Sequence, residues 1–230
     1  MNTITEIRFG EYCFGADPAL TEKHCRQLTD LFAQPSLPEH SVLGGRTAIM
    51  ETRLEPIGDV VAKSYRRGGL VRFFIRETYL NLGSIRCRTE YEQLHHALQL
   101  GISVPRPVAY AYRGGLFYRG WLITEKISNQ QTLASLSLTD LPRAQAAGEA
   151  LREQVRKLID NQILHQDLHP GNVLVTADGK VFIIDFDKAG PCRASRQQLA
   201  ARYRKRWHRA VAKYNLPIEI SQALEAGFRF

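Results

Sequence analysis

Residues 165–190 read HQDLHPGNVLVTADGKVFIIDFDKAG and carry the most informative pattern of the chain. A polar loop, His165–Asn172, is followed by two short apolar runs, and the Asp-Gly pair between those runs is typical of a hairpin turn. Because a hairpin returns the chain on itself, we expect Asp185 to lie beside Asn172. The stretch therefore predicts that polar side chains from two places in the sequence come together.

These polar side chains are of the kind that phosphoryl transfer requires. That reaction needs an aligned nucleophile and neutralisation of the phosphate charge, mostly by metal ions. We predict Asp167 as the catalytic base and Asn172 and Asp185 as oxygen ligands of Mg²⁺, with ATP as phosphoryl donor. The spacing matches the H-x-D-x-x-x-x-N and D-F-G elements of the kinase superfamily. A plain turn rich in Asp and Asn is the structural alternative, but both elements in this order, with a hairpin between them, favour catalysis.

The first half of the chain contains a candidate cation for the ATP phosphates. The runs Thr47–Leu54 and Val60–Tyr65 predict a strand hairpin, with Lys63 in its second strand. Residues Arg86–Leu100 predict a helix, and we expect Glu90 of that helix to pair with Lys63, with Glu77 as the fallback. Glu90 lies beside the apolar stripe of the helix, which is formed by Cys87, Tyr91, Leu94 and Leu98.

Other expected nucleotide contacts have weaker support. Gly44 and Gly45 stand where a glycine-rich phosphate cover would precede the first hairpin, although a tight turn explains two glycines nearly as well. A hinge is expected near Glu125–Asn129, after the predicted strand Leu116–Ile127. Within it, Glu125 and Ile127 are taken as ATP contacts.

The order of the expected elements predicts an α+β chain with a two-lobed, protein-kinase-like fold. A strand-rich N-lobe with one helix would cover residues 1–127. A reduced helical C-lobe would cover residues 128–230 and hold the catalytic loop, the metal site and the acceptor side. The long helix of that lobe is expected at Arg143–Ile163, and everything after the second hairpin is expected to be helical.

Composition narrows the class of ligand. The 230 residues are 44% apolar and carry a formal net charge of +8, which fits an anionic ligand but is not focused enough to indicate nucleic acid. The four cysteines have no paired or metal-binding spacing, which predicts buried free thiols. No secretory signal is expected at the N-terminus, and no apolar run approaches the roughly 20 residues that span a bilayer.

Most of the chain from about residue 40 to residue 214 resembles the lipopolysaccharide core kinase family, and within it the kinases that act on 3-deoxy-D-manno-octulosonic acid (Kdo). The resemblance is carried by YRRGGLVRFFIRETYLNL at 65–82, RCRTEYEQLHHALQLGISVPRP at 86–107, GLFYRGWLITEKI at 115–127, and residues 165–190. It implies ATP as donor and the 4-hydroxyl of Kdo on a lipid A precursor as acceptor. It also implies a peripheral position on the cytoplasmic face of the bacterial inner membrane.

Departures from protein kinases leave other readings open. Gln166 replaces the Arg of H-R-D, and Asp187 replaces the Gly of D-F-G, with a role near the metals or as a cap. The alternative acceptors are a core heptose and a small molecule such as an aminoglycoside or choline. A pseudokinase, which binds partners without catalysis, is disfavoured because Lys63 and the three polar residues are all present.

Two basic segments are candidates for contact with an anionic glycolipid or a membrane surface. In Tyr65–Arg76 four arginines are interleaved with apolar residues, Leu70, Val71, Phe73 and Phe74, and this composition favours lipid contact. In Leu199–Tyr214 one helix face is apolar and the rest is basic. Packing in the core with a solvated basic back is slightly favoured there over an interfacial helix.

Overall fold

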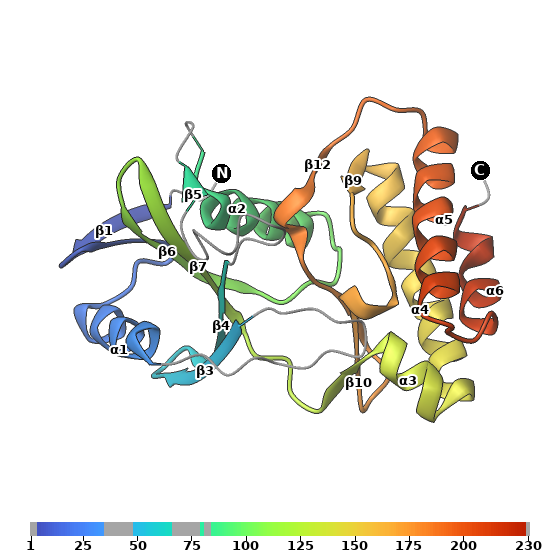
Figure 1. The fold of residues 1–230 in the computed structure, drawn as a ribbon, viewed down its shortest axis with the longest axis horizontal. Helices are drawn as coiled ribbons and strands as arrows, with labels where there is room; N and C mark the ends of the chain where they lie inside the picture. The colour runs from blue at the N-terminus through green and yellow to red at the C-terminus, as the bar shows by residue number, and fades with distance from the viewer. Residues whose placement is uncertain (1–3, 35–47, 66–78, 81–83, 229–230) are drawn as a thin grey trace. The chain divides into compact units, whose positions relative to one another are not determined.

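The computed structural model describes residues 4–34, 48–65, 79–80 and 84–228. Helices and antiparallel sheets occur together, which confirms the α+β class (Figure 1). The chain divides into two compact units. The first consists of residues 1–40, 45–92 and 106–126, and the second of residues 41–44, 93–105 and 127–230. The simpler division into 1–127 and 128–230 stays a prediction.

The first unit is built on a seven-stranded antiparallel sheet with the order β1-β2-β6-β7-β4-β3, in which β5 also pairs with β7. The predicted strand hairpin is confirmed as β3 and β4, and the predicted strand at Leu116–Ile127 as β7. The elements of this unit, with α2 running on into the second, are β1 (Thr5–Phe9), β2 (Tyr12–Ala16), α1 (Glu22–Ala33), β3 (Ala48–Leu54), β4 (Gly58–Ser64), β5 (Tyr79–Leu80), α2 (Arg86–Gln99), β6 (Pro107–Gly114) and β7 (Phe117–Glu125).

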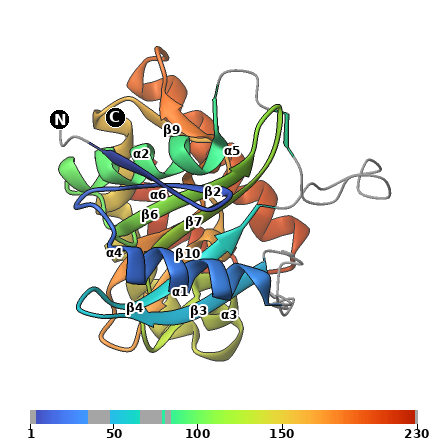
Figure 2. The same cartoon turned by 90° about the vertical axis from the view of Figure 1, so that its left-hand side faces the viewer.

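Helix α1 packs on the sheet and supplies much of the core of this unit (Figure 2). Its Phe32 stacks on Trp121 of β7, with ring centroids 4.5 Å apart. Thr21 begins the helix because its side chain accepts a hydrogen bond from the backbone N–H of His24. The expectation of one helix in the first half was therefore wrong. The buried residues Cys25, Leu28, Leu31 and Phe32 recur at helical spacing, so the sequence contained the signal for α1 and it was not used.

Helix α2 carries the stripe that the sequence predicted, with one exception. Cys87, Tyr91 and Leu94 are buried, but Leu98 is exposed, and Ala97 takes the buried position in the last turn. The expectation that Leu98 lies on the buried face was therefore wrong.

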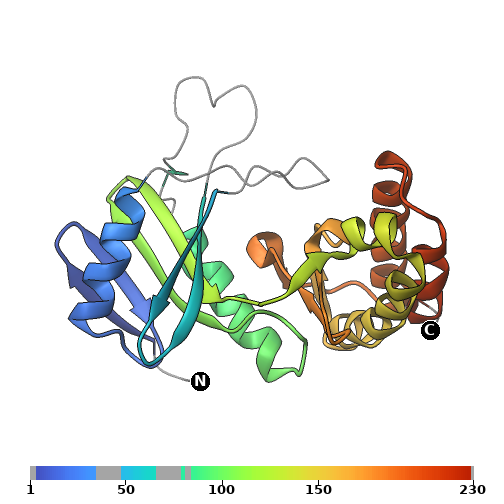
Figure 3. The same ribbon diagram turned by 90° about the horizontal axis from the view of Figure 1, so that it is seen from below.

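The second unit consists mainly of helices that lie side by side, with short strands at their edge (Figure 3). The predicted hairpin of residues 173–184 is confirmed as β10 and β11, in the register Val173↔Ile183. The elements of this unit are β8 (Gln130–Thr132), α3 (Leu133–Thr139), α4 (Leu141–Asp160), β9 (Ile163–His165), a 3₁₀ turn (Pro170–Asn172), β10 (Val173–Thr176), β11 (Val181–Ile183), a 3₁₀ turn (Phe186–Lys188), β12 (Ala189–Pro191), α5 (Arg196–Lys213), α6 (Glu219–Glu225) and a 3₁₀ turn (Ala226–Phe228).

Two expectations for this unit were wrong in detail. Helix α4 ends at Asp160 rather than Ile163, because Gln162 has a positive φ of 53° that stops the helix and Ile163 begins β9. The part after the second hairpin is not wholly helical, since β12 pairs with β9.

The helix expected at Leu199–Tyr214 is confirmed as α5, and its apolar face packs in the core. Leu199, Tyr203, Trp207 and Val211 are all at most 3% exposed. Burial of these side chains leaves the basic side chains as the outer face of the helix.

The cysteines are all free, but they are not all buried. Cys25 and Cys87 are buried, whereas Cys13 and Cys192 are only half-buried. No described helix is long and apolar enough to cross a membrane.

Candidate functional site

Lys63 and Glu90 form an ion pair inside the first unit. Lys63 lies on β4, which is an interior strand because it pairs with both β3 and β7. Its Nζ is 3.0 Å from Oε1 and 3.1 Å from Oε2 of Glu90 on α2. Glu90 is 1% exposed, and burial of a carboxylate is costly unless the group is paired. The pair therefore supports the sheet–helix contact and holds the ammonium group in one place.

Tyr65 is a third member of this cluster, and the sequence reasoning missed it. Its hydroxyl donates a hydrogen bond to Oε2 of Glu90, and its ring lies 5.3 Å from Nζ of Lys63. The sequence did contain a signal for Tyr65. It lies two residues after Lys63, so in an extended strand the two side chains point to the same side. Oε2 of the buried carboxylate therefore accepts hydrogen bonds from both Lys63 and Tyr65.

In the second unit, the loop after β9 is fixed by hydrogen bonds at both ends. Nε2 of His165 lies 3.0 Å from the carbonyl oxygen of Ile184. Nδ2 of Asn172 donates to the carbonyl oxygen of Asp167 at 3.0 Å. The loop therefore holds Asp167 and Asn172 in a defined relation to each other.

The turn after β11 places Asp185 next to this loop. The backbone N–H of Ile184 donates to the carbonyl oxygen of Asn172 at 3.0 Å, which continues the β10–β11 ladder by one step. Asp185 then adopts a left-handed conformation, with φ 67° and ψ 58°, which is uncommon for a residue other than glycine. Phe186 packs edge-on against His165, with ring centroids 4.8 Å apart. The structure thus brings Asn172 and Asp185 together, as expected from the hairpin.

The carboxylate of Asp167 is held by a residue that the sequence reasoning did not select. Nε of Arg206, on α5, donates to Oδ1 of Asp167 at 3.0 Å, and Nη2 donates to the same oxygen. Nε2 of His169 lies 3.9 Å from the other oxygen, Oδ2. No signal in the sequence separates Arg206 from the other cations of α5, because the contact spans 39 residues.

Both histidines of the loop are held neutral. Burial lowers the pKa of His165 below its ordinary value of 6.5, although its bond to Ile184 and the charges of Asp185 and Asp167 oppose this. Burial also lowers the pKa of His169, helped by the charge of Arg206. Arg206 is thus the cation against Asp167 near neutral pH.

The remaining predicted residues are more scattered. Glu125 is exposed at the end of β7 and pairs with Arg106, and Ile127 is half-buried just after it. Asp187 is half-buried in the 3₁₀ turn that follows Asp185. Gly44, Gly45, the fallback Glu77 and the basic segment 66–76 lie outside the described residues.

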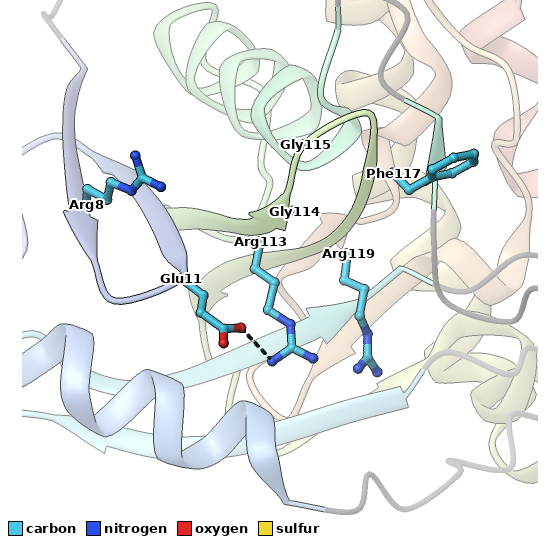
Figure 4. A pocket seen from close by; sticks show the side chains of 7 residues that line it. All are labelled: Arg8, Glu11, Arg113, Gly114, Gly115, Phe117 and Arg119. Atoms are coloured by element: carbon cyan, nitrogen blue, oxygen red, sulfur yellow. Dashed lines mark ion pairs between the residues drawn. The ribbon is translucent and has the colours of Figure 1, made fainter.

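An open pocket of about 730 Å³ lies in the first unit, around the β6–β7 hairpin (Figure 4). Arg113 and Arg119 face each other across the two strands, and Glu11 pairs with Arg113 at 3.5 Å. None of the sequence-predicted site residues lines this pocket. It is therefore separate from the residues that carry the phosphotransferase pattern.

The residues around the second hairpin fit a magnesium ion. Because Nδ2 of Asn172 is used by the Asp167 carbonyl, the side-chain oxygen of Asn172 is the group left for a cation. Asp185 stands in the turn just after β11, and oxygen donors of both kinds are ligands that Mg²⁺ prefers. The donor set therefore agrees with the chemistry expected of the site.

Comparison with known proteins gives one family. The model described as "Lipopolysaccharide kinase (Kdo/WaaP) family" matches residues 42–223 of the chain, a range that includes every residue of the candidate site.

The three relatives described next have the same name. The chain is 36% identical over 129 residues to 3-deoxy-D-manno-octulosonic acid kinase of Vibrio cholerae, over 55% of this chain and 54% of that protein. The protein of the same name from Photobacterium profundum is 40% identical over 129 residues, with the same coverage of 55% and 54%. That from Xanthomonas campestris pv. campestris is 35% identical over 166 residues, or 69% of this chain and 64% of the relative. The chain thus spans about half the length of the first curated relatives it matches.

Proposed function

The chain belongs to the lipopolysaccharide kinase (Kdo/WaaP) family, and from this premise we propose that it transfers the γ-phosphoryl group of ATP to a sugar hydroxyl of the lipopolysaccharide inner core. The proposed acceptor is the 4-hydroxyl of Kdo on a lipid A precursor. The names of the relatives support this choice of sugar.

One observation carries the proposal. In the second unit, a single loop and the hairpin after it gather a carboxylate, an amide oxygen and a second carboxylate, from Asp167, Asn172 and Asp185. This is the set that phosphoryl transfer to an alcohol uses for proton removal and for metal binding. A structural turn would not require all three side chains.

Each residue has a proposed role in the reaction. Asp167 accepts the proton of the acceptor hydroxyl as the oxygen attacks phosphorus. Asn172 and Asp185 would hold Mg²⁺, which neutralises phosphate charge when it is bound. Lys63 contacts the α- and β-phosphates of ATP and Glu90 orients it, while Gly44, Gly45, Glu125 and Ile127 complete the nucleotide contacts.

The fold and location follow the same proposal. The proposed lobes of a protein-kinase-like fold are a strand-rich lobe of residues 1–127 and a helical lobe of residues 128–230. The two units follow this division except at residues 41–44, 93–105 and 127, which group with the second unit. The protein works at the cytoplasmic face of the bacterial inner membrane, where it contacts the surface peripherally to reach its glycolipid acceptor.

The decisive experiment is mass spectrometry of a Kdo-lipid A precursor incubated with the protein, ATP and Mg²⁺. One added phosphate on the Kdo residue is expected with the wild type, and none with Asp185→Asn. Asp178→Asn is the matched control, because Asp178 is an exposed carboxylate in the turn of the same hairpin. Phosphate on heptose, or on an aminoglycoside or choline in a parallel screen, would move the protein to a different acceptor class.

A further inference from the structure

Arg206 is held in place more firmly than an ordinary surface arginine. One turn earlier on α5, the hydroxyl of Tyr203 accepts a hydrogen bond from the N–H of His165 at 2.8 Å and donates one to the carbonyl oxygen of Ile163 at 2.7 Å. These two bonds tie α5 to β9, the strand that leads into the Asp167 loop. Helix α5 also packs against the 3₁₀ turn Pro170–Asn172. The position of the guanidinium group relative to Asp167 is thus set by the fold of the second unit.

Among the described residues, the guanidinium group of Arg206 donates hydrogen bonds through one edge. A guanidinium group has five N–H donors in a planar fork. The Nε–Nη2 edge of Arg206 points at Oδ1 of Asp167. Nη1 makes no hydrogen bond to any residue that the structure describes, and the side chain is 28% exposed. The Nη1–Nη2 edge is therefore a prearranged and accessible donor pair next to the proposed catalytic base.

An anion with two oxygens in a plane matches such an edge. Arginine binds carboxylates through two parallel N–H···O bonds, which lysine cannot reproduce. Kdo is an acid, and its carboxylate is attached to the anomeric carbon, two ring carbons away from the carbon that bears the 4-hydroxyl. A group that binds this carboxylate beside Asp167 would bring the 4-hydroxyl toward Oδ2, the oxygen that Arg206 leaves uncovered.

We propose that the free edge of Arg206 binds the carboxylate of the acceptor sugar. The inference rests on the proposed function, and it explains why the enzyme would select an acidic sugar as acceptor. Arg206 would then have two partners in the complex, with the base on one edge and the acceptor on the other. A neutral sugar would leave the second edge without a partner, and the chain would bind it more weakly.

The test is a cycle of enzyme and acceptor variants. Transfer is measured with the wild type, Arg206→Gln, Arg206→Lys and Arg209→Gln, on the natural Kdo-lipid A precursor and on its Kdo methyl ester. Arg209 lies on the same helix, is exposed and serves as the matched control. Melting temperatures show which variants fold. If Arg206→Gln does not fold, Arg206→Lys carries the cycle, because it keeps the charge and loses the fork.

On the natural acceptor, Arg206→Gln is expected to lower kcat/KM about 10- to 100-fold, mostly through KM for the acceptor, as is typical for loss of a hydrogen bond to a charged group. KM for ATP stays unchanged, and Arg206→Lys recovers part of the loss. On the methyl ester, the wild type is expected to lose most of its advantage over Arg206→Gln, and the difference that remains comes from the contact of Arg206 with Asp167.

An equal penalty for Arg206→Gln on both acceptors would overturn the inference, because it would mean that Arg206 only positions Asp167. A penalty that disappears on an acceptor without lipid phosphates, but persists on the methyl ester, would overturn it as well, since the bound anion would then be a phosphate. If the wild type transfers no phosphate to the natural acceptor, the proposed function itself fails, and this outcome is distinct from the other two.

Discussion

Two carboxylates in this protein accept hydrogen bonds from a cation, yet their surroundings differ. The Glu90 side chain is 2% exposed in the first unit, and both of its oxygens are bonded to Lys63 or Tyr65. The Asp167 side chain is 45% exposed in the second unit, and Arg206 uses only one of its oxygens. Glu90 is therefore a fixed part of the core, whereas Asp167 keeps an accessible oxygen. The difference separates a carboxylate that orients a cation from one that can react.

The largest effect on activity is expected at Asp167. Replacing it with Asn removes the proton acceptor and keeps the shape of the side chain, so phosphate transfer should fall about 10²- to 10⁴-fold. The melting temperature should change little, because the side chain is half-exposed. Radiolabelled ATP with the glycolipid acceptor, together with thermal unfolding, measures both quantities. Wild-type turnover in this variant would remove Asp167 from the proposed mechanism.

Replacement of Glu90 should affect stability as well as activity. Glu90→Ala leaves Lys63 beside an empty buried space, and loss of one partner from a buried pair typically costs about 3–5 kcal/mol of unfolding free energy. Denaturant unfolding should therefore shift strongly for Glu90→Ala and hardly at all for Asp167→Asn.

Glu92 is the matched control, because it lies on the exposed side of the same helix and pairs with Arg88. Surface ion pairs contribute about 0–1 kcal/mol, so Glu92→Ala should remain close to the wild type. If Glu90→Ala and Glu92→Ala had equal stability, the contrast between a core carboxylate and a reactive one would not hold.

Tyr65 gives a smaller test of the same cluster. Tyr65→Phe removes one hydrogen bond to the charged Glu90 and keeps the ring, which is expected to cost about 1.5–3 kcal/mol of stability. The double variant with Glu90→Ala should cost less than the sum of the two single variants, because Glu90→Ala already removes the acceptor of the Tyr65 bond. Additive costs would mean that the hydroxyl acts through a different partner.

The site was more predictable where its parts are close in sequence. The loop and hairpin of residues 165–190 follow from spacing and turn chemistry, since the side-chain contacts needed there span between 5 and 19 residues. Glu90 could be selected because helical periodicity places it beside Cys87 and Tyr91. Arg206 could not, because α5 carries several cations at its surface, and only the tertiary packing of Tyr203 shows which one reaches the loop.

The fold was less well predicted in helices α1 and α2. In α1 the buried residues Cys25, Leu28, Leu31 and Phe32 recur at helical spacing, so the signal was present in the sequence and was not used. In α2 the periodicity predicts Leu98 as buried, but the smaller Ala97 is enclosed instead. Neighbouring elements decide which residue of the last turn is covered, and a single helix pattern does not contain that information.

The smallest effect concerns pH and the buried ring of His165. The charges of Asp167 and Asp185 act on this ring, and the backbone N–H of the same residue donates to the hydroxyl of Tyr203. Burial lowers the pKa of His165 in the folded state below the ordinary 6.5 of the unfolded chain. Above pH 6.5 the ring is neutral in both states, and the full stability is present. Below pH 6.5 the unfolded chain binds a proton that the folded chain does not, so unfolding free energy should fall by up to about 1.4 kcal/mol per pH unit.

Urea unfolding at pH 7.0 and pH 5.5 measures this slope. His165→Asn should reduce this slope, and the part that remains is expected from His169, whose pKa is also lowered by burial. His96, exposed on α2, supplies the control, and its Asn variant should keep the wild-type slope. A wild-type stability that rises on acidification would show that His165 gains its proton in the folded state. In that case the group that binds the carbonyl oxygen of Ile184 and fixes the Asp167 loop would not be a neutral ring.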